Sequence, residues 1–159
     1  MKILIVGVPR SGTTSLLNSI CNFNYLRIGE PYNYSLGTFY KFPLVELEKY
    51  KRVCVKSIIL ESPDNFKGSL NLFYLKWIDN FDRVILLDRL NEEEHLKSFI
   101  NLCYRIHKNQ SVWVNWCYSE IPNNFIEEFK NSKQFSDFYH AKLELQRLSY
   151  TANIPITYY

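Results

Sequence analysis

The residues with the clearest chemical meaning lie near the start of the chain, between Gly7 and Thr14. Their sequence, Gly-Val-Pro-Arg-Ser-Gly-Thr-Thr, has the P-loop spacing Gly-x4-Gly-x-[Ser/Thr] and follows the short apolar run 3–6. In such a loop, successive backbone N–H groups and the positive end of the next helix surround a phosphate. The spacing therefore predicts a strand, a phosphate-binding loop and the start of a helix.

The loop departs from the nucleotide-kinase pattern, because Thr13 stands where the Walker lysine would be and the basic residue is Arg10. The run Pro-Arg-Ser-Gly-Thr-Thr, residues 9–14, resembles the 5′-phosphosulfate loop of the sulfotransferases, Pro-[Lys/Arg]-x-Gly-Thr-Thr. The resemblance implies that the chain binds the donor 3′-phosphoadenosine 5′-phosphosulfate (PAPS). It assigns the 5′-phosphosulfate to the loop and the helix start, namely Pro9, Arg10, Ser11, Gly12, Thr13, Thr14 and Ser15.

The replacement of the lysine has a physical sense. A Walker lysine serves the β- and γ-phosphates of a triphosphate that is held with Mg²⁺. A donor with one phosphate and one sulfonate is shorter and carries less charge, so that one arginine, the loop amides and two hydroxyl groups could suffice. The alternative is a tight glycine turn between a strand and a helix that binds no ligand.

A second candidate site follows the apolar run 83–88. Arg89 comes directly after this run, and Ser98 comes nine residues later. Ligands of open parallel sheets bind beyond the carboxyl ends of the strands, so we expect Arg89 on the same rim as the P-loop. In sulfotransferases a strand-end arginine and a serine of the next helix hold the 3′-phosphate, and the resemblance assigns this role to Arg89 and Ser98. Alternatively, Arg89 pairs with the acidic residues 92–94 and Ser98 is an ordinary surface serine.

Two further residues could carry the chemistry of sulfuryl transfer. Transfer to an alcohol needs a base for the hydroxyl proton, and Glu30, which precedes Pro31, can supply a carboxylate. Some carbohydrate sulfotransferases have a Glu-Pro pair in this region, with the glutamate as base. Lys56 could stabilise charge on the leaving group. The alternatives are a glutamate in a surface turn and a lysine in solvent.

The sequence departs from the cytosolic type of sulfotransferase at the residue pair Lys56-Ser57. Many sulfotransferases have a catalytic histidine after this Lys-[Ser/Thr] pair, whereas Ile58 follows here. This departure gives Glu30 more weight as the base. The chain is also short for the family, whose members often continue after the last strand into a helix and a basic loop over the donor.

Composition limits the class of protein. The 159 residues are 47% hydrophobic and 16% aromatic, which predicts a single domain over 1–159 with an aromatic-rich core. A net charge of +3 without a basic block favours small anionic ligands over nucleic acid. The four cysteines are widely spaced and do not suggest a zinc site or a disulfide framework. Without a signal peptide or a long apolar run, we expect a cytoplasmic protein with no membrane span.

These residues need a scaffold, and alternating strand and helix signals predict an α/β fold. We expect a three-layer P-loop fold with a central parallel sheet of about four to five strands flanked by helices. The expected strands are 3–6, 52–58, 83–88 and 154–158, of which 83–88 should be fully buried. Helices are expected from the P-loop to about residue 21 or 23, then over 43–50, 69–81, 91–107, 122–130 and 137–151. Ser69 and Asn91 are the expected N-caps of two of them, and 24–42 is expected to be rich in turns.

Other polar and aromatic residues carry weaker signals. The core face of helix 91–107 is predicted to consist of Leu96, Phe99, Ile100, Cys103 and Ile106. The three histidines, His95, His107 and His140, have no ligand spacing and are predicted at the surface or at helix ends. Trp77 falls in a core stripe, and Trp113 or Trp116 could stack on adenine. The aromatic segment 32–42 is expected to border the acceptor.

The hypothesis with the most support is a PAPS-dependent sulfotransferase that modifies a hydroxyl of a small-molecule or carbohydrate acceptor. Glu30 and Lys56 are its predicted catalytic residues, and no metal is expected. One alternative is an ATP-dependent kinase or NTPase, in which Asp88 would be a Walker B carboxylate. Another is a non-catalytic nucleotide-binding member of the fold. The acceptor and the oligomeric state cannot be read from the sequence.

Overall fold

The computed structural model describes residues 1–21, 24–31, 47–61, 69–108 and 120–159. At its centre is a five-stranded sheet with the strand order β2-β3-β1-β4-β5. The strands are β1 (Lys2–Gly7), β2 (Leu26–Gly29), β3 (Val53–Ile58), β4 (Arg83–Asp88) and β5 (Ile156–Tyr158). All neighbouring strands pair in parallel. The chain therefore has the predicted α/β fold with a parallel sheet.

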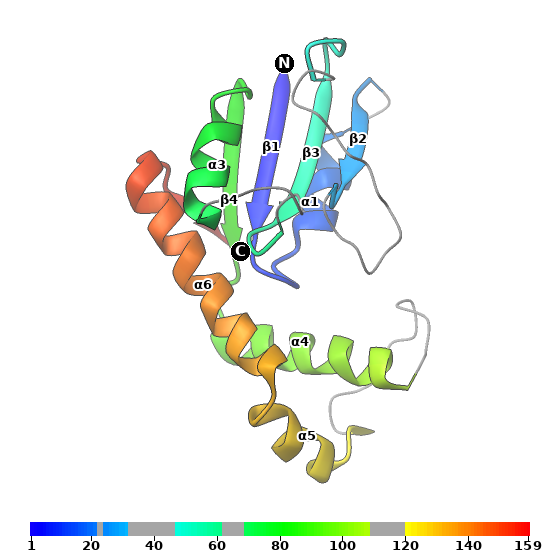
Figure 1. The fold of residues 1–159 in the computed structure, drawn as a ribbon. Helices are drawn as coiled ribbons and strands as arrows, with labels where there is room; N and C mark the ends of the chain where they lie inside the picture. The colour runs from blue at the N-terminus through cyan, green and yellow to red at the C-terminus, as the bar shows by residue number, and fades with distance from the viewer. Residues whose placement is uncertain (22–23, 32–46, 62–68, 109–119) are drawn as a thin grey trace.

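Helices lie on both faces of the sheet and beyond one of its edges (Figure 1). They are α1 (Thr13–Ile20), α3 (Leu70–Ile78), α4 (Glu92–His107), α5 (Asn123–Lys130) and α6 (Lys133–Ala152). In this view α1 lies behind the sheet, whereas α3 lies in front of it and packs against α6. Helices α4 and α5 lie below the carboxyl ends of the strands. None of the helices in these described ranges is long and apolar enough to cross a membrane.

Strand β1 is apolar along its whole length because both of its faces are covered. Ile3 and Ile5 belong to a cluster that includes Leu17 of α1, whereas Leu4 and Val6 belong to the larger cluster. That larger cluster contains many aromatic side chains, among them Phe73, Tyr74, Trp77, Phe99, Tyr104, Phe129 and Phe138. The expected aromatic-rich core is confirmed for the described residues.

Side-chain caps fix the starts of three helices. The Ser69 hydroxyl accepts a hydrogen bond from the Leu72 N–H at 3.3 Å, and Asn91 Oδ1 accepts one from the Glu94 N–H at 3.1 Å. Both caps were expected from the sequence. Ser132 caps α6 in the same way, so this helix begins four residues before the predicted start of 137.

Three expectations about the elements are wrong. Strand β2 lies in the segment that was predicted to be rich in turns. It has four residues of which only Ile28 is buried, so the sequence carries no strand pattern there. Strand β4 is buried only in its second half, since β5 pairs with Leu86–Asp88 and leaves the first half at the sheet edge. In α4, Ile106 is 61% exposed, whereas the polar His95, Asn101 and Arg105 are buried. Helix α4 lies beyond the carboxyl ends of the strands, so its polar side faces the P-loop region.

Several predictions concern residues outside the described ranges. These are most of the helix expected at 43–50, the acceptor-bordering segment 32–42, and the two tryptophans Trp113 and Trp116.

Candidate functional site

The P-loop connects β1 to α1 through a turn in which the Ser11 N–H donates to the Val8 carbonyl at 3.1 Å. Arg10 and Gly12 have φ values of 67° and 74°, so both adopt the left-handed conformation. Gly12 is the N-cap of α1 and provides no side-chain cap. The first amides of α1 therefore have no capping side chain at the N-cap, an arrangement that suits an anion.

The Ser11 and Thr13 side chains point back into the protein rather than outwards. A Cβ on Gly7 would lie 2.5 Å from both Ser11 Oγ and Thr13 Cγ2, and 2.9 Å from the Leu87 carbonyl oxygen. Gly7 is thus required by close packing. The Ser11 hydroxyl is buried without a hydrogen-bond partner among the described residues, whereas the Arg10 and Thr14 side chains are exposed.

Lys56, Thr14 and Glu30 meet at the start of α1. Lys56 Nζ donates a hydrogen bond to Thr14 Oγ1 at 2.9 Å and forms an ion pair with the Glu30 carboxylate. Parallel pairing brings the two strands together, since the Glu30 N–H donates to the Lys56 carbonyl at 2.7 Å. Glu30 has a φ of 48° and Lys56 is only 6% exposed. The structure therefore brings together both predicted catalytic residues and the P-loop helix.

This arrangement places an ammonium group beside the P-loop although the Walker lysine is missing. Lys56 belongs to the neighbouring strand β3 and reaches the second residue of α1 from there. The ion pair with Glu30 partly compensates the cost of burying its charge. The site thus offers a fixed cation and a carboxylate within reach of one ligand.

Glu61 was not singled out in the sequence, and it adds a second carboxylate to this cluster. Burial raises the pKa of the Glu61 carboxyl to about 8, and the negative charge of Glu30 adds to this effect. A hydrogen bond from the Ile58 N–H and the charge of Lys56 act in the opposite direction. A glutamate three residues after a strand is too common a pattern to be recognised beforehand.

Because the folded pKa of Glu61 lies above its ordinary value, its ionisation should destabilise the protein at high pH. The unfolded chain releases this proton near pH 4.5 and the folded protein only near pH 8, so stability is lost as the pH rises between these values. At pH 9 we expect the free energy of unfolding of Glu61→Gln to exceed that of the wild type by on the order of 2 kcal/mol. The variant should therefore unfold at a higher denaturant concentration. The two proteins should be nearly equal at pH 5.

Urea unfolding at both pH values tests this expectation. The matched control is Glu48→Gln, since Glu48 is exposed and its replacement should leave the pH dependence of the wild type unchanged. Equal pH dependences for wild type and Glu61→Gln would contradict the raised pKa.

The second predicted pair, Arg89 and Ser98, is not joined by a hydrogen bond in the part of the chain that the structure describes. Arg89 Nη1 donates to the Glu94 carbonyl at 3.3 Å, and its guanidinium lies 5.8 Å from the centre of the Tyr159 ring. Ser98 Oγ instead accepts from Arg10 Nε of the P-loop at 3.1 Å. The P-loop and α4 therefore face each other through Arg10 and Ser98.

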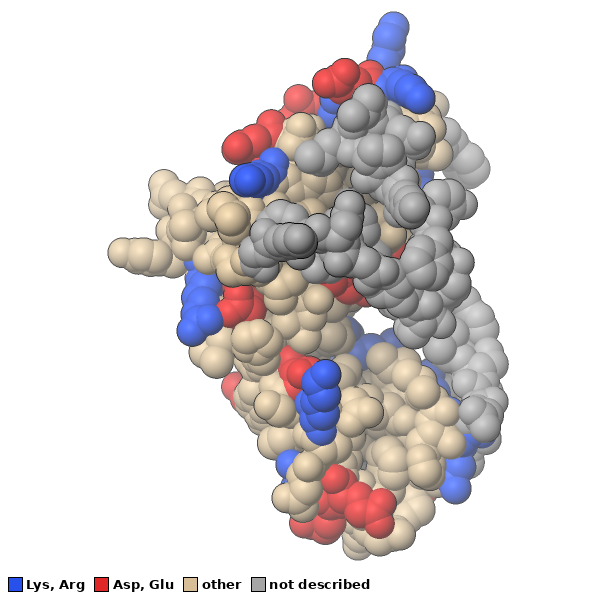
Figure 2. Space-filling model, viewed as in Figure 1, with Lys and Arg blue, Asp and Glu red and all other residues tan. Residues whose placement is uncertain are grey.

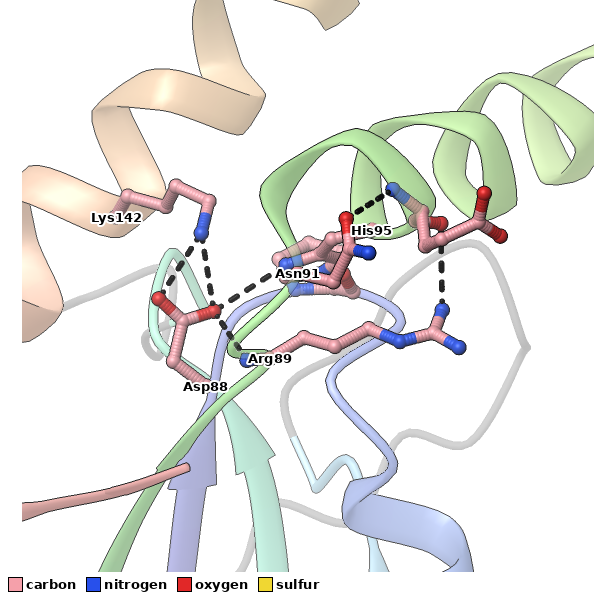
Figure 3. A network of polar contacts seen from close by, with 7 residues as sticks. Asp88, Arg89, Asn91, His95 and Lys142 are labelled. Carbon is pink, nitrogen blue, oxygen red and sulfur yellow. Dashed lines mark hydrogen bonds and ion pairs between the residues drawn. The ribbon is translucent and has the colours of Figure 1, made fainter. Parts of the chain in front are cut away.

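A buried ionic network connects β4, α4 and α6 at the same edge (Figure 3). The Asp88 carboxylate accepts from Lys142 Nζ at 3.0 and 3.2 Å and from the Arg89 N–H at 2.8 Å. Burial alone would raise the pKa of Asp88, but hydrogen bonding with His95, the Arg89 amide and Lys142 holds it below its usual value. The Asp88 carboxylate therefore links β4, α4 and α6, and both of its oxygens accept hydrogen bonds.

His95, predicted at the surface or at a helix end, belongs to this network. It lies in the first turns of α4, but its side chain is completely buried and does not face the surface. Its Nδ1 lies 3.2 Å from Asp88 Oδ1, and its Nε2 donates to the Pro9 carbonyl of the P-loop at 2.7 Å. The ring also packs edge-on against Phe138. His107 and His140 are exposed, as expected.

The signal for His95 was present in the spacing of α4. It lies four residues before the buried Phe99, which places it on the same face of the helix. The remaining predicted residue, Ser15, is exposed and lines a groove between α1 and the β4–β5 side of the sheet. Among the described residues, no cluster of three His, Cys, Asp or Glu side chains is arranged to hold a metal ion.

Comparisons with protein-family models, with curated proteins and with solved structures find no match to this chain. A function is therefore inferred from the residues of the site.

Proposed function

We propose that this protein is a sulfotransferase that moves a sulfuryl group from PAPS to a hydroxyl group of a small-molecule or carbohydrate acceptor. The observation that carries the proposal is the contact of Lys56 with both Thr14 and Glu30 at the start of α1. It joins a cation for the leaving group, a carboxylate for the acceptor proton and a P-loop into one site. These are the groups that sulfuryl transfer requires.

The reaction would be an in-line displacement at sulfur. The acceptor oxygen forms a bond to sulfur while the bond from sulfur to the bridging phosphate oxygen breaks, and Glu30 takes the hydroxyl proton. The products are a sulfate monoester, adenosine 3′,5′-bisphosphate and protonated Glu30. Lys56 and the amides of the P-loop stabilise the charge that develops on the leaving phosphate. The ion pair with Lys56 holds the Glu30 carboxylate in place for this step.

The donor would lie along the carboxyl edge of the sheet. In this proposal Arg10, Gly12 and Thr14 of the P-loop bind the 5′-phosphosulfate, and Arg89 and Ser98 of the β4–α4 side bind the 3′-phosphate. For Arg89 this requires its guanidinium to exchange the long contact with the Glu94 carbonyl, at 3.3 Å, for the phosphate. An exchange of this kind is favourable because a phosphate is charged and the carbonyl is not.

The ATP-dependent alternative receives less support from the geometry. A Walker B aspartate needs carboxylate oxygens that are directed at Mg²⁺ or its water ligands. Both oxygens of Asp88 are instead bound by Lys142, and one of them also contacts the Arg89 amide and His95.

Calorimetric titration of the purified chain tests the proposal. We expect adenosine 3′,5′-bisphosphate to bind with a Kd in the micromolar range, which corresponds to a binding free energy of about −8 kcal/mol. ATP with Mg²⁺ should bind at least tenfold more weakly. A preference for ATP would contradict the proposal and favour the hypothesis of an ATP-dependent kinase or NTPase. If neither ligand binds, the site is not a donor site for adenosine nucleotides.

A further inference from the structure

Three successive carbonyl groups at the start of the P-loop each accept a hydrogen bond from within the protein. The donors to the Gly7 and Val8 carbonyls are backbone N–H groups, at 3.0 and 3.1 Å. The donor to the Pro9 carbonyl is a side chain, His95 Nε2 of α4, at 2.7 Å. A backbone N–H is present whatever the side chain is, so of these three carbonyl groups that of Pro9 alone is held by a particular residue type.

The His95 ring is fixed in its place beside the loop. A carbonyl oxygen only accepts hydrogen bonds, so Nε2 carries the proton of the contact with Pro9. The side chain is completely buried, its Nδ1 lies 3.2 Å from Asp88 Oδ1, and its ring packs edge-on against Phe138. Figure 3 shows His95 next to the loop that follows β1. The hydrogen bond to Pro9 therefore comes from a donor whose position and direction are set by the surrounding protein.

The peptide between Pro9 and Arg10 is held in a strained conformation. Arg10 has a φ of 67°, in the left-handed region that costs free energy for an arginine. In this trans peptide the Pro9 carbonyl and the Arg10 N–H point in opposite directions. A half-turn of the peptide would exchange these directions and bring the φ of Arg10 to a negative value, where an arginine is not strained. The hydrogen bond from His95 opposes this half-turn.

The direction of this peptide matters for an anion at the loop. A loop binds an anion by turning successive N–H groups towards it, whereas a carbonyl oxygen that faces the anion repels it. Figure 2 shows the molecule hollowed between the sheet and helices α4 and α5, with Lys and Arg atoms at the margin of the hollow. The P-loop follows β1 at this end of the sheet (Figure 1). A Pro9 carbonyl that is held by α4 is kept from turning towards an anion in the loop.

We propose that His95 is a positioning residue of the P-loop, which holds the Pro9 carbonyl away from a bound oxyanion and keeps the Arg10 N–H directed at it. His95 acts through the backbone of the loop and does not touch the ligand. Asp88 orients its ring and is itself bound by Lys142, so the network connects α6 to the loop. The inference rests on the proposed function, in which the oxyanion is the 5′-phosphosulfate of the donor.

Glutamine and asparagine at position 95 form a matched pair for a titration with inorganic phosphate. The amide nitrogen of a glutamine can take the place of Nε2 and donate to the Pro9 carbonyl, whereas an asparagine is one methylene too short. Both variants lose the ring against Phe138, so a loss of stability that they share reports on packing. Because affinity falls with the fraction of molecules whose loop is competent, we expect His95→Asn to weaken phosphate binding about tenfold and His95→Gln less than about threefold.

The ¹³C chemical shifts of Arg10 in the ligand-free protein test the conformation of the loop directly. The Cα and Cβ shifts of a residue differ between left-handed and other backbone conformations. Wild type and His95→Gln should show the left-handed values, and His95→Asn should lose them. The control is His140→Asn, which replaces an exposed histidine of α6 and should match the wild type in its Arg10 shifts and in phosphate binding.

The wild type provides a measurement that does not depend on the folding of a variant. Because the effects of two linked events on each other are reciprocal, bound phosphate should slow the exchange of the His95 Nε2 proton with water by about threefold or more. The proposal is overturned if phosphate leaves this exchange unchanged, or if His95→Asn and His95→Gln fold and bind phosphate alike. A protein in which phosphate binding follows the expected pattern but which binds no adenosine nucleotide would keep the role of His95 and reject the sulfotransferase proposal.

Discussion

Replacing Glu30 by glutamine should lower turnover roughly a hundredfold or more while the affinity for adenosine 3′,5′-bisphosphate stays within about threefold. Glutamine has nearly the same shape but cannot accept the proton of the attacking hydroxyl. The proposed donor contacts of Arg10, Gly12 and Thr14 would remain. A loss confined to turnover therefore identifies Glu30 as the base, because a general defect of the site would also weaken the donor.

The control for this variant is Glu127→Gln. Glu127 also pairs with a lysine, since Lys130 Nζ lies 2.8 Å from its carboxylate, but both residues are exposed and belong to α5. The same chemical change there should leave turnover unaltered, because exposed ion pairs contribute little. Thermal unfolding of Glu30→Gln shows whether the site stays folded when Lys56 loses the charge of its carboxylate partner. Unchanged turnover in a folded Glu30→Gln protein would remove Glu30 from the mechanism.

The left-handed backbone of Glu30 gives this prediction additional weight. A glutamate with a φ of 48° is held in a conformation that costs free energy for residues other than glycine. Arg10 has the same property, with a φ of 67°. Both residues were selected from the sequence for their chemistry, and the observed strain lies at these same two residues of the candidate site.

The α/β fold could be predicted because its signals are local. Strand β1 is a continuous apolar run between two covered faces, and the caps Ser69 and Asn91 stand directly before their helices. Strand β2 could not be predicted, since four residues with one buried side chain leave no periodic pattern. Its place in the sheet comes from pairing with β3, which is a tertiary interaction.

The candidate site was predictable to the extent that it depends on the rim of a parallel sheet. Glu30 and Lys56 were selected from the sequence for their chemistry, and the structure pairs them. The rule that residues after parallel strands gather at one end of the sheet predicted only that Arg89 lies on the rim of the P-loop. It could not tell which side chains of α4 would face the P-loop. The orientation of that helix is fixed by tertiary contacts, among them the contact of His95 with Pro9, so the sequence did not place His95 beside the loop.

Replacing Asp88 by asparagine should destabilise the protein by about 3–5 kcal/mol at pH 7, the usual effect of breaking a buried ion pair. Asp88 is 6% exposed, and its replacement leaves the Lys142 ammonium without a counter-charge. Lys142 is bound by both carboxylate oxygens, of which an asparagine retains one. Because His95 also holds the Pro9 carbonyl, the loss should extend to the P-loop and weaken donor binding.

Urea unfolding of Asp88→Asn and of the control Asp82→Asn measures this difference. Asp82 accepts a hydrogen bond from the Lys2 N–H and pairs with the N-terminal amine at the exposed start of β1, so its replacement should cost less than about 1 kcal/mol. Folding lowers the pKa of Asp88. Its carboxylate therefore stabilises the protein above the unfolded pKa and ceases to do so as the pH falls through the folded pKa.

The difference in the free energy of unfolding between wild type and Asp88→Asn should accordingly become smaller in acid. A difference that is small at pH 7, or that does not depend on pH, would show that the network does not hold the carboxyl end of the sheet together.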